Sequence, residues 1–158
     1  MKFIADVMLG RLAKRLRLLG HDVLYDSTLD DNALIRISLE EDRVILTRDT
    51  GLARRPLARN HLFIRDDNPG DQVGQVLSFL DGVSAFARSL PLTRCSVFNG
   101  PLTPLGKTDA QDLVPAHVFR THDKFLHCVG CNRVYWRGTH TERMQVGQKG
   151  RKGTKRRG

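Results

Sequence analysis

Residues 2–20 read KFIADVMLGRLAKRLRLLG, in which an apolar run ends at an aspartate and leucines then recur at helical spacing. The run at residues 2–5 predicts a strand that ends just before Asp6. A helix is predicted next, and Gly20 supplies its stop signal. The apolar positions of this helix are Leu9, Leu12, Ala13, Leu16 and Leu19. The stretch therefore predicts one β-α unit.

The same alternation continues through the first 80 residues. Further strands are expected at residues 23–25, 44–46 and 62–64. Helices are expected at residues 31–41, just after Thr50, and from about 71 to 80. In the helix at 31–41, the side chains expected to face inward are Leu34, Ile37 and Ser38. Four successive β-α units indicate an α/β fold with a mostly parallel, right-handed sheet covered by helices on both faces.

Aspartates follow three of these apolar runs. They are Asp6, the pair Asp30 and Asp31, and Asp49. Because ligands of open α/β folds bind outside the carboxyl ends of the strands, we expect these acids to meet at one edge of the sheet. Carboxylates gathered there suit a hard cation that faces a phosphate, which indicates a nuclease. The spacing is equally compatible with Asp31 and Asp49 as helix N-caps and Asp6 as a turn residue.

The length and the composition limit the possible classes of protein. A chain of 158 residues has room for one domain of about 100 residues and a small annex. It contains no run of about 18 apolar residues and no signal-peptide pattern, so we expect a cytoplasmic protein without a membrane partner. An odd number of cysteines argues against a disulfide framework and favours metal binding in a reducing compartment.

The net charge of +9 comes entirely from the C-terminal part. Residues 1–92 hold 13 basic and 13 acidic side chains, so their charges balance. Residues 146–158 contain no acid and predict a disordered basic arm for a polyanion, with a merely solubilising end as the alternative. The cations of this arm are Lys149, Arg151, Lys152, Lys155, Arg156 and Arg157.

After a boundary at residues 81–92, prolines and glycines interrupt the chain, and only short strand-like runs remain, at residues 117–119 and 133–136. A module of this size needs a metal or a neighbour to hold it. We therefore expect a domain at residues 1–90, a small β module at residues 91–145 and a tail at residues 146–158.

Several motifs together resemble those of the Mut7-C RNase family. In the first domain they are KFIADVMLGRLA at residues 2–13, LRLLG at 16–20, the pair Asp30-Asp31, and ILTRD at 45–49. In the second they are Arg94-Cys95 with Asn99-Gly100, the knuckle Cys128-Val129-Gly130-Cys131, and VYWRGTH at 134–140. The resemblance covers residues 1–145 and implies a PIN-like nuclease domain with an appended zinc ribbon.

The resemblance also implies a chemistry. Asp6, Asp30 or Asp31, and Asp49 would be catalytic and would hold Mg²⁺ or Mn²⁺. PIN-like nucleases usually have four acids, and the candidates for the fourth are Asp66 and Asp67, just after the last strand. No serine or cysteine of the first domain has a histidine and an acid patterned around it, so covalent catalysis has no support.

Basic and aromatic side chains provide candidate contacts to RNA. Arg11 and Arg15 lie four residues apart on the first helix, opposite its apolar stripe, while Lys14 and Arg17 are equally compatible with a solvated face. Arg48 is expected to bind phosphate or to pair with the acids. In the second module, Trp136, Arg137, His140 and Arg143 would stack a base and contact phosphate, or would form a packed tryptophan with a solvated rim.

The ribbon departs from a four-ligand zinc site. Its cysteines are Cys95, Cys128 and Cys131, and Phe98 stands where the fourth thiolate is expected. A Cys₃His site completed by His122, His127 or His140 is one outcome. In the other, Phe98 fills the space with apolar surface and the module rests on the first domain without metal.

The sequence thus predicts a metal-dependent ribonuclease whose ribbon and basic tail grip RNA, with transfer RNA and ribosomal RNA among the candidate substrates. The alternative is a non-catalytic RNA- or ribosome-binding protein whose acids are structural. A DNA nuclease is a third option, because a basic tail does not distinguish RNA from DNA.

Overall fold

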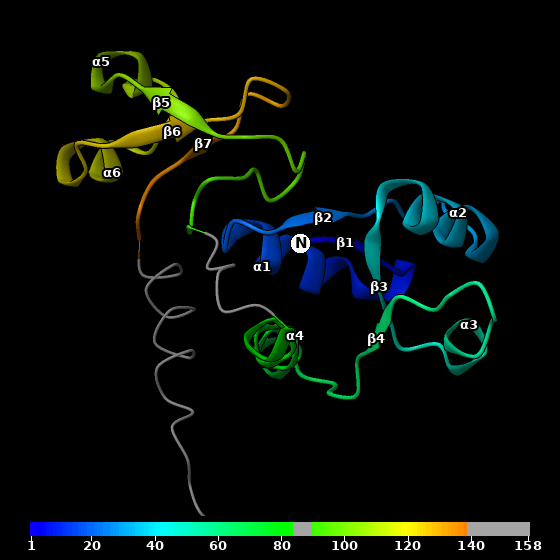
Figure 1. Cartoon of the computed structure of the whole chain (residues 1–158). Helices are drawn as coiled ribbons and strands as arrows, with labels where there is room; N and C mark the ends of the chain where they lie inside the picture. The colour runs from blue at the N-terminus through cyan, green and yellow to red at the C-terminus, as the bar shows by residue number, and fades with distance from the viewer. Residues whose placement is uncertain (84–89, 139–158) are drawn as a thin grey trace, which may run out of the picture.

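The computed structural model describes residues 1–83 and 90–138, which form two sheets (Figure 1). The first is parallel and has the order β2-β1-β3-β4. Its strands are β1 (Lys2–Ala5), β2 (Asp22–Leu24), β3 (Arg43–Thr47) and β4 (His61–Phe63). The second is antiparallel, with β5 (Thr103–Leu105), β6 (Phe125–His127) and β7 (Val134–Tyr135) in that order. The expected α/β class, with a parallel sheet and a small β module, is confirmed.

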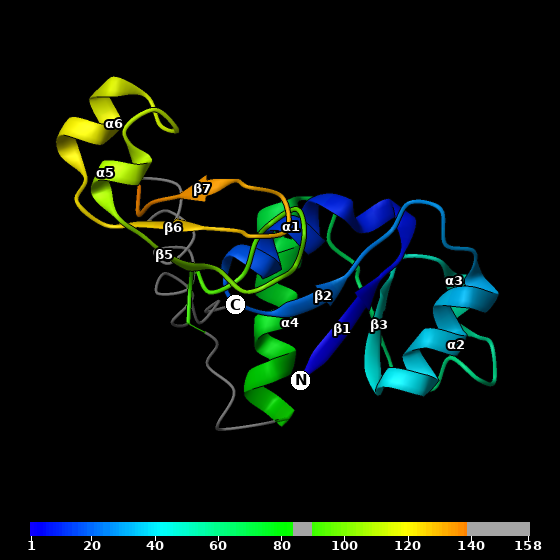
Figure 2. The same ribbon diagram turned by 90° about the horizontal axis from the view of Figure 1, so that it is seen from above.

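Helices cover both faces of the parallel sheet (Figure 2). α1 (Gly10–Leu18) and α4 (Pro69–Val83) pack on one face. α2 (Asp31–Glu41) and α3 (Thr50–Ala53) pack on the other. A 3₁₀ helix, η1 (Val7–Leu9), joins β1 to α1. The second module carries the short helices α5 (Lys107–Ala110) and α6 (Ala116–Thr121).

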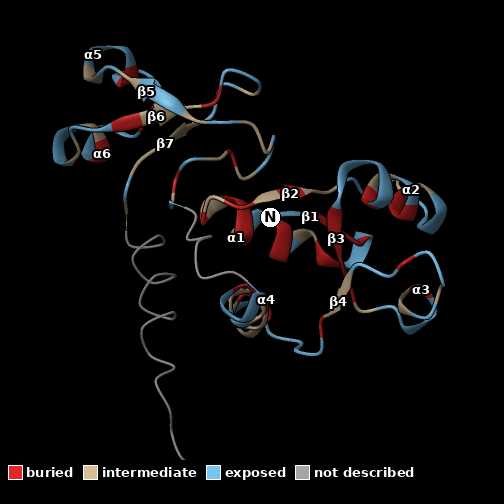
Figure 3. Ribbon diagram, viewed as in Figure 1, coloured by how far each residue is buried: buried red, intermediate tan, exposed pale blue. Residues whose placement is uncertain are grey.

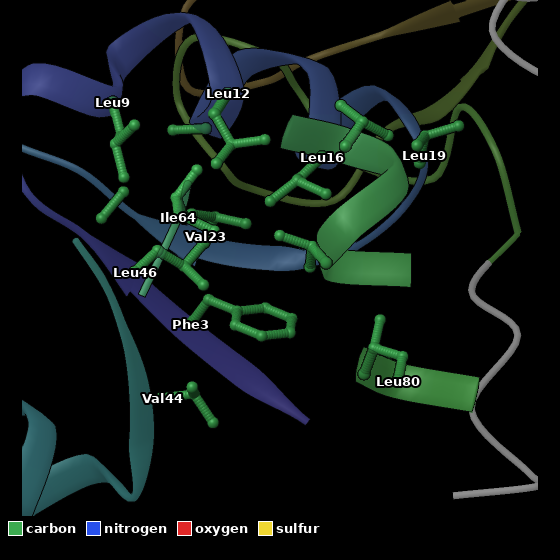
Figure 4. Close-up of a cluster of buried hydrophobic side chains, with 14 residues drawn as sticks. Phe3, Leu9, Leu12, Leu16, Leu19, Val23, Val44, Leu46, Ile64 and Leu80 are labelled. Carbon is green, nitrogen blue, oxygen red and sulfur yellow. The ribbon is translucent and has the colours of Figure 1, made fainter. Parts of the chain in front are cut away.

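The strand pleat divides the core between the two helical layers, because successive side chains of a strand point to opposite faces. Phe3 and Leu46 lie in the larger cluster with the leucines of α1, as Figure 4 shows. Ile4 and Ile45 lie in the smaller cluster under α2 and α3. Both strands are buried on their two sides (Figure 3). Each large side chain buried in this way stabilises the fold by about 1.5–3 kcal/mol.

The strand order creates a switch point between β1 and β3. The chain passes from β1 to β2 on one side and then crosses to β3 on the other. At such a point the loops after the two strands lead away in opposite directions, which leaves a crevice at their carboxyl ends. Asp6 follows β1 directly, and Asp49 lies two residues beyond β3. Two of the predicted acids therefore stand at the switch point.

One local prediction was wrong. Residues 117–119 were expected to be a strand but lie within α6. So short a run does not distinguish a helix from a strand, and Pro115 fixes the backbone at the helix start. In α2, Leu34, Ile37 and Ser38 face the core as expected, with Ile37 half-buried, and Ile35 is buried as well. Among the described helices, none is long and apolar enough to cross a membrane.

Candidate active site at the sheet edge and cysteine cluster

One hydroxyl links the two acids at the switch point. The buried Thr47 donates a hydrogen bond from Oγ1 to Asp6 Oδ2 at 2.9 Å. The same Oγ1 accepts one from the Asp49 amide at 2.9 Å. Asp6 Oδ1 also accepts from the Val7 amide at 2.6 Å. The end of β3 thus fixes the Asp6 carboxylate and the backbone of Asp49 relative to each other.

Asp6 is a buried charge without a cationic partner in the described part of the chain. Asp6 is only 6% exposed. Its carboxylate accepts the two hydrogen bonds from Thr47 and Val7 and forms no ion pair with a described residue. Buried charges in proteins are generally paired or coordinate metals. Each carboxylate oxygen retains a free lone pair beside its hydrogen bond. The geometry therefore favours a cation at Asp6.

The remaining acids have local structural partners. Asp49 caps α3 through Oδ1, which accepts from the amides of Gly51 and Leu52. Asp30, rather than Asp31, caps α2 by accepting from Ala33 at 2.7 Å. Asp31 lies 3.9 Å from Arg55. In the described residues, these acids and Asp6 do not form a group of three with oxygens within 4.8 Å of one another, and a complete cage of carboxylates is not assembled.

A hollow of about 470 Å³ opens beside η1 at the same edge of the sheet. Arg11 and Arg48 line it, together with Tyr25, whose hydroxyl donates to the carbonyl of Val7 at 3.0 Å. Arg48 pairs with Asp67, which also lines the hollow, as the sequence allowed. Arg11 is exposed and makes no hydrogen bond or ion pair with the described residues. The hollow thus has one arginine available for a phosphate.

Arg17 is buried, which corrects the solvated position that the sequence allowed for it. Its Nε donates to the carbonyl of Val23 at 2.8 Å, and its Nη1 donates to those of Ser96 and Val97 at 3.1 and 3.0 Å. Burial lowers the pKa of this guanidinium, and the nearby Cys95 acts in the opposite direction. Arg17 therefore joins α1 and β2 to the first cysteine knuckle.

Asp22 forms a second connection at the edge strand β2. Its carboxylate pairs with Arg43 at 2.8 Å and Arg94 at 3.6 Å and accepts from Asn99 Nδ2 at 2.9 Å. Asn99 Oδ1 accepts from the Val23 amide at 3.1 Å, which satisfies part of the exposed strand edge. Burial alone would raise the pKa of Asp22, but these hydrogen bonds and positive charges bring it below its usual value.

The three cysteines lie together. The sulfurs of Cys95, Cys128 and Cys131 are all within 4.8 Å of one another, and those of Cys95 and Cys131 are 3.5 Å apart. Burial acts to raise the pKa of Cys95, but hydrogen bonds from the Tyr135 hydroxyl and the amides of Phe98 and Val97 lower it to about 7. Thiolates so gathered suit a thiophilic ion such as Zn²⁺.

A closed four-ligand site does not fit the described residues. Phe98 is 59% exposed, and its ring lies against the backbone of Gly130, where even a Cβ atom would collide with it. His122 and His127 are outside the sulfur cluster and bond instead to the carbonyl of Arg137 and the hydroxyl of Thr103. Three cysteine sulfurs fit the ion, and none of the described residues supplies the fourth ligand of a structural zinc site.

The other residues predicted to contact RNA differ in their surroundings, and some lie outside the described residues. Arg15 is on α1, and its Nη1 lies near the start of α4 at Gly70. Trp136 is half-buried against the small core of the second module and contacts the ring of His122 edge-on, so it has a packing role there. Arg137 is exposed. Outside the described residues lie His140, Arg143, Lys149, Arg151, Lys152, Lys155, Arg156 and Arg157.

The sequence analysis missed three residues that hold the candidate sites together through hydrogen bonds. Thr47 lies in the run ILTRD at residues 45–49. It is two residues after the buried Ile45 and therefore on the same face of the strand, and this spacing could have predicted that its hydroxyl is buried. Tyr135 and Asn99 bond to Cys95 and to β2 across more than 35 residues of chain, and no local pattern indicates such contacts.

Comparison with known proteins gives one family. A family model described as the Mut7-C RNAse domain matches residues 1–147. The matched range includes the sheet edge and all three cysteines. No curated protein and no solved structure matches the chain.

Proposed function

The chain belongs to the Mut7-C RNAse domain family, and we propose that it is a metal-dependent endoribonuclease that hydrolyses phosphodiester bonds in RNA. Membership indicates a ribonuclease role. Metal dependence, endonucleolytic cleavage and the residues named below are our proposal. We assign the nuclease domain to residues 1–90, the ribbon-like module to residues 91–145 and the basic tail to residues 146–158.

The buried Asp6 carboxylate carries the proposal. It stands at the switch point of the sheet with hydrogen bonds but no cationic partner in the described residues, and Thr47 holds it in register with Asp49. Mg²⁺ needs only one or two carboxylates, because waters and substrate phosphates complete its octahedron. Asp6 and Asp49 would hold the ion, and Asp30 or Asp31 at the start of α2 would complete the site when substrate is bound.

An Mg²⁺ or Mn²⁺ ion held by Asp6 and Asp49 would supply the chemistry of metal-assisted hydrolysis, namely an activated water and charge stabilisation of the leaving oxygen. The protein orients the reacting groups. Thr47 fixes the Asp6 carboxylate, and the amides of Gly51 and Leu52 fix that of Asp49. Arg11, at the start of α1, binds a neighbouring phosphate beside the hollow. Asp66 and Asp67 remain candidates for the fourth acid, and Asp67 is paired to Arg48.

RNA contacts outside the sheet edge would hold the substrate. Arg15 and Arg48 extend the basic surface of the nuclease domain, and Arg137 with the cations of residues 139–158 extends it on the second module. Since such contacts go to the phosphate backbone, they provide affinity without sequence preference.

A non-catalytic RNA- or ribosome-binding protein is the alternative. One observation favours it: Asp6, Asp30 and Asp49 each cap a helix, so each already has a structural role. The two functions differ in one measurable respect, since a binding protein holds RNA without cleaving it.

The test incubates the purified full chain with a panel of single-stranded and structured RNAs in Mg²⁺, in Mn²⁺ and in chelator. We expect cleavage with either ion and none in chelator. Tight binding without cleavage of any RNA in either ion would replace the nuclease with the binding protein. Cleavage that continues unchanged in chelator would reject the metal-dependent mechanism.

A further inference from the structure

The first cysteine knuckle has the same backbone form as the second, although it contains only one cysteine. In the second knuckle, the Cys128 amide donates to the carbonyl of Arg133 at 3.0 Å, and the Asn132 amide donates to that of Cys128 at 2.7 Å. Asn132 has a left-handed backbone with φ 58°. Cys128 and Cys131 both contribute sulfurs to the cluster, so the backbone of this knuckle is the one with which the first knuckle is compared.

The first knuckle repeats each of these features. The Cys95 amide donates to the carbonyl of Gly100 at 2.8 Å, and the Asn99 amide donates to that of Cys95 at 2.9 Å. Asn99 has φ 61°. Phe98 therefore occupies the position equivalent to Cys131. The loop has the form that presents two sulfurs, but it presents only one.

The position opposite the three sulfurs is not filled by another described ligand. The Phe98 ring lies over Gly130 at the surface, and no described histidine or carboxylate joins the cluster. The Tyr135 hydroxyl is 3.1 Å from Cys95 Sγ, accepts from the Ser96 amide at 3.2 Å and lies 3.1 Å from Ser96 Oγ. When Ser96 Oγ donates to it, the hydroxyl donates its own proton to the sulfur. Such a partner orients a metal-bound thiolate and does not itself take a ligand position.

We propose that the cluster of Cys95, Cys128 and Cys131 binds Zn²⁺ through three thiolates and leaves the fourth position to an exchangeable ligand, either water or a small thiol or imidazole. Three protein ligands and one open position distinguish zinc sites that accept exogenous ligands from closed structural sites. Tyr135 is a positioning residue for the Cys95 thiolate. The site is separate from the acids of the sheet edge, so its test does not depend on nuclease activity.

Metal at this site would also order the contact between the two parts of the molecule. The carbonyls of Ser96 and Val97, within the first knuckle, accept the guanidinium of Arg17. Asn99, at the end of the same knuckle, bonds to β2. A loaded cluster would therefore raise the thermal stability of the whole chain, which provides a second readout.

The test loads the reduced full chain with Co²⁺ under anaerobic conditions and follows its visible absorption. We expect thiolate-to-cobalt charge transfer and d–d bands that shift when imidazole is added and return when it is removed. Phe98→Cys should abolish the shift, whereas Phe98→Leu, which restores no ligand, should keep it. Tyr135→Phe should weaken Co²⁺ binding by roughly tenfold or more, as loss of an outer partner does.

Two results would overturn the proposal. Wild-type bands that do not respond to imidazole would mean that a protein group closes the site. Absence of thiolate-to-cobalt absorption in both wild type and Phe98→Leu would mean that the cluster holds no metal. If Phe98→Cys fails to fold, the wild type and Phe98→Leu still decide the question.

Discussion

Thr47 is the residue through which the edge of the sheet arranges its two acids. Its hydroxyl donates a hydrogen bond to the Asp6 carboxylate and accepts one from the Asp49 amide. Because it lies at the end of a buried strand, its rotamer is held by packing on both sides. A site built on a rigid strand holds its groups more precisely than one built on a loop.

Replacement of Thr47 by valine keeps its shape and removes both hydrogen bonds. Asp6 Oδ2 and the Asp49 amide then lose their partner, so the free energy of unfolding should fall by about 1–3 kcal/mol. A misplacement of about 1 Å at the carboxylates should lower the cleavage rate by about 100-fold. Urea denaturation and single-turnover cleavage measure the two effects.

Thr47→Ser is the matched control because it retains the hydroxyl. We expect it to stay close to wild type in cleavage rate, with a modest loss of stability from the missing methyl group. Equal activity of the valine and serine variants would show that the hydroxyl does not position the acids.

At the scale of elements, α1 has two faces with different roles. Its apolar face covers the sheet, and its polar face meets the first cysteine knuckle through Arg17 and the hollow through Arg11. Gly20, just after the helix, has φ 90°, and a Cβ there would lie 2.2 Å from the carbonyl of Leu90. The chain can therefore place residue 90 against the helix end only because position 20 is glycine.

Arg17→Met should destabilise the protein strongly. It removes the hydrogen bonds to three carbonyls at the junction of the two parts, and we expect a loss on the order of 3 kcal/mol. Arg11→Met, on the same helix but exposed, should change stability by less than about 0.5 kcal/mol. Chemical denaturation of the two variants compares them directly. Similar losses for both would mean that the Arg17 contacts do not hold the junction.

The elements of the parallel sheet could be predicted from the sequence because their signals are local. Apolar runs, leucine spacing and Gly20 specify β1 and α1, and the acids mark where the strands end. The second module was less predictable. Its strands are two or three residues long and owe their pairing to partners far along the chain, so neither β5 nor β6 has a periodic signal of its own.

The candidate site could likewise be predicted where its signals are local, but not where it depends on contacts between distant segments. The placement of Asp6 and Asp49 at one edge was predictable from parallel topology. The link through Thr47 and the burial of Arg17 were not, because each depends on which side chain a distant segment presents. The gathering of Asp30 or Asp31 with the other acids stays a prediction.

At the scale of the whole molecule, the charge is divided between a balanced N-terminal part, residues 1–92, and a basic C-terminal part. The acids of the proposed active site would repel RNA, so affinity must come from cations elsewhere. The six cations of residues 146–158 are the densest group in the sequence. We assign to them a large share of the binding energy and no part in the chemistry.

Deletion of residues 146–158 should weaken RNA binding and leave cleavage of saturating RNA intact. Each phosphate of a single strand that is neutralised contributes about −0.7 to the slope of log affinity against log salt concentration. If all six cations engage, the slope should become shallower by about 4 units, and if half engage, by about 2. Fluorescence anisotropy across a salt series measures it. An unchanged slope would make the tail only a solubilising end.

The central claim is that Asp6 and Asp49 hold a catalytic cation, and the most direct measurement is the cleavage rate of their asparagine variants in Mg²⁺. Asparagine caps a helix as well as aspartate does, so Asp6→Asn and Asp49→Asn remove the charge and keep the fold. Mutation of residues that only hydrogen-bond to metal ligands lowers metal affinity or activity by roughly 10–100-fold. Loss of a ligand itself should therefore lower the cleavage rate of each variant by at least about 100-fold. Asp112→Asn, at an exposed position of the second module, should cleave like wild type. Wild-type rates for folded Asp6→Asn and Asp49→Asn would contradict the account.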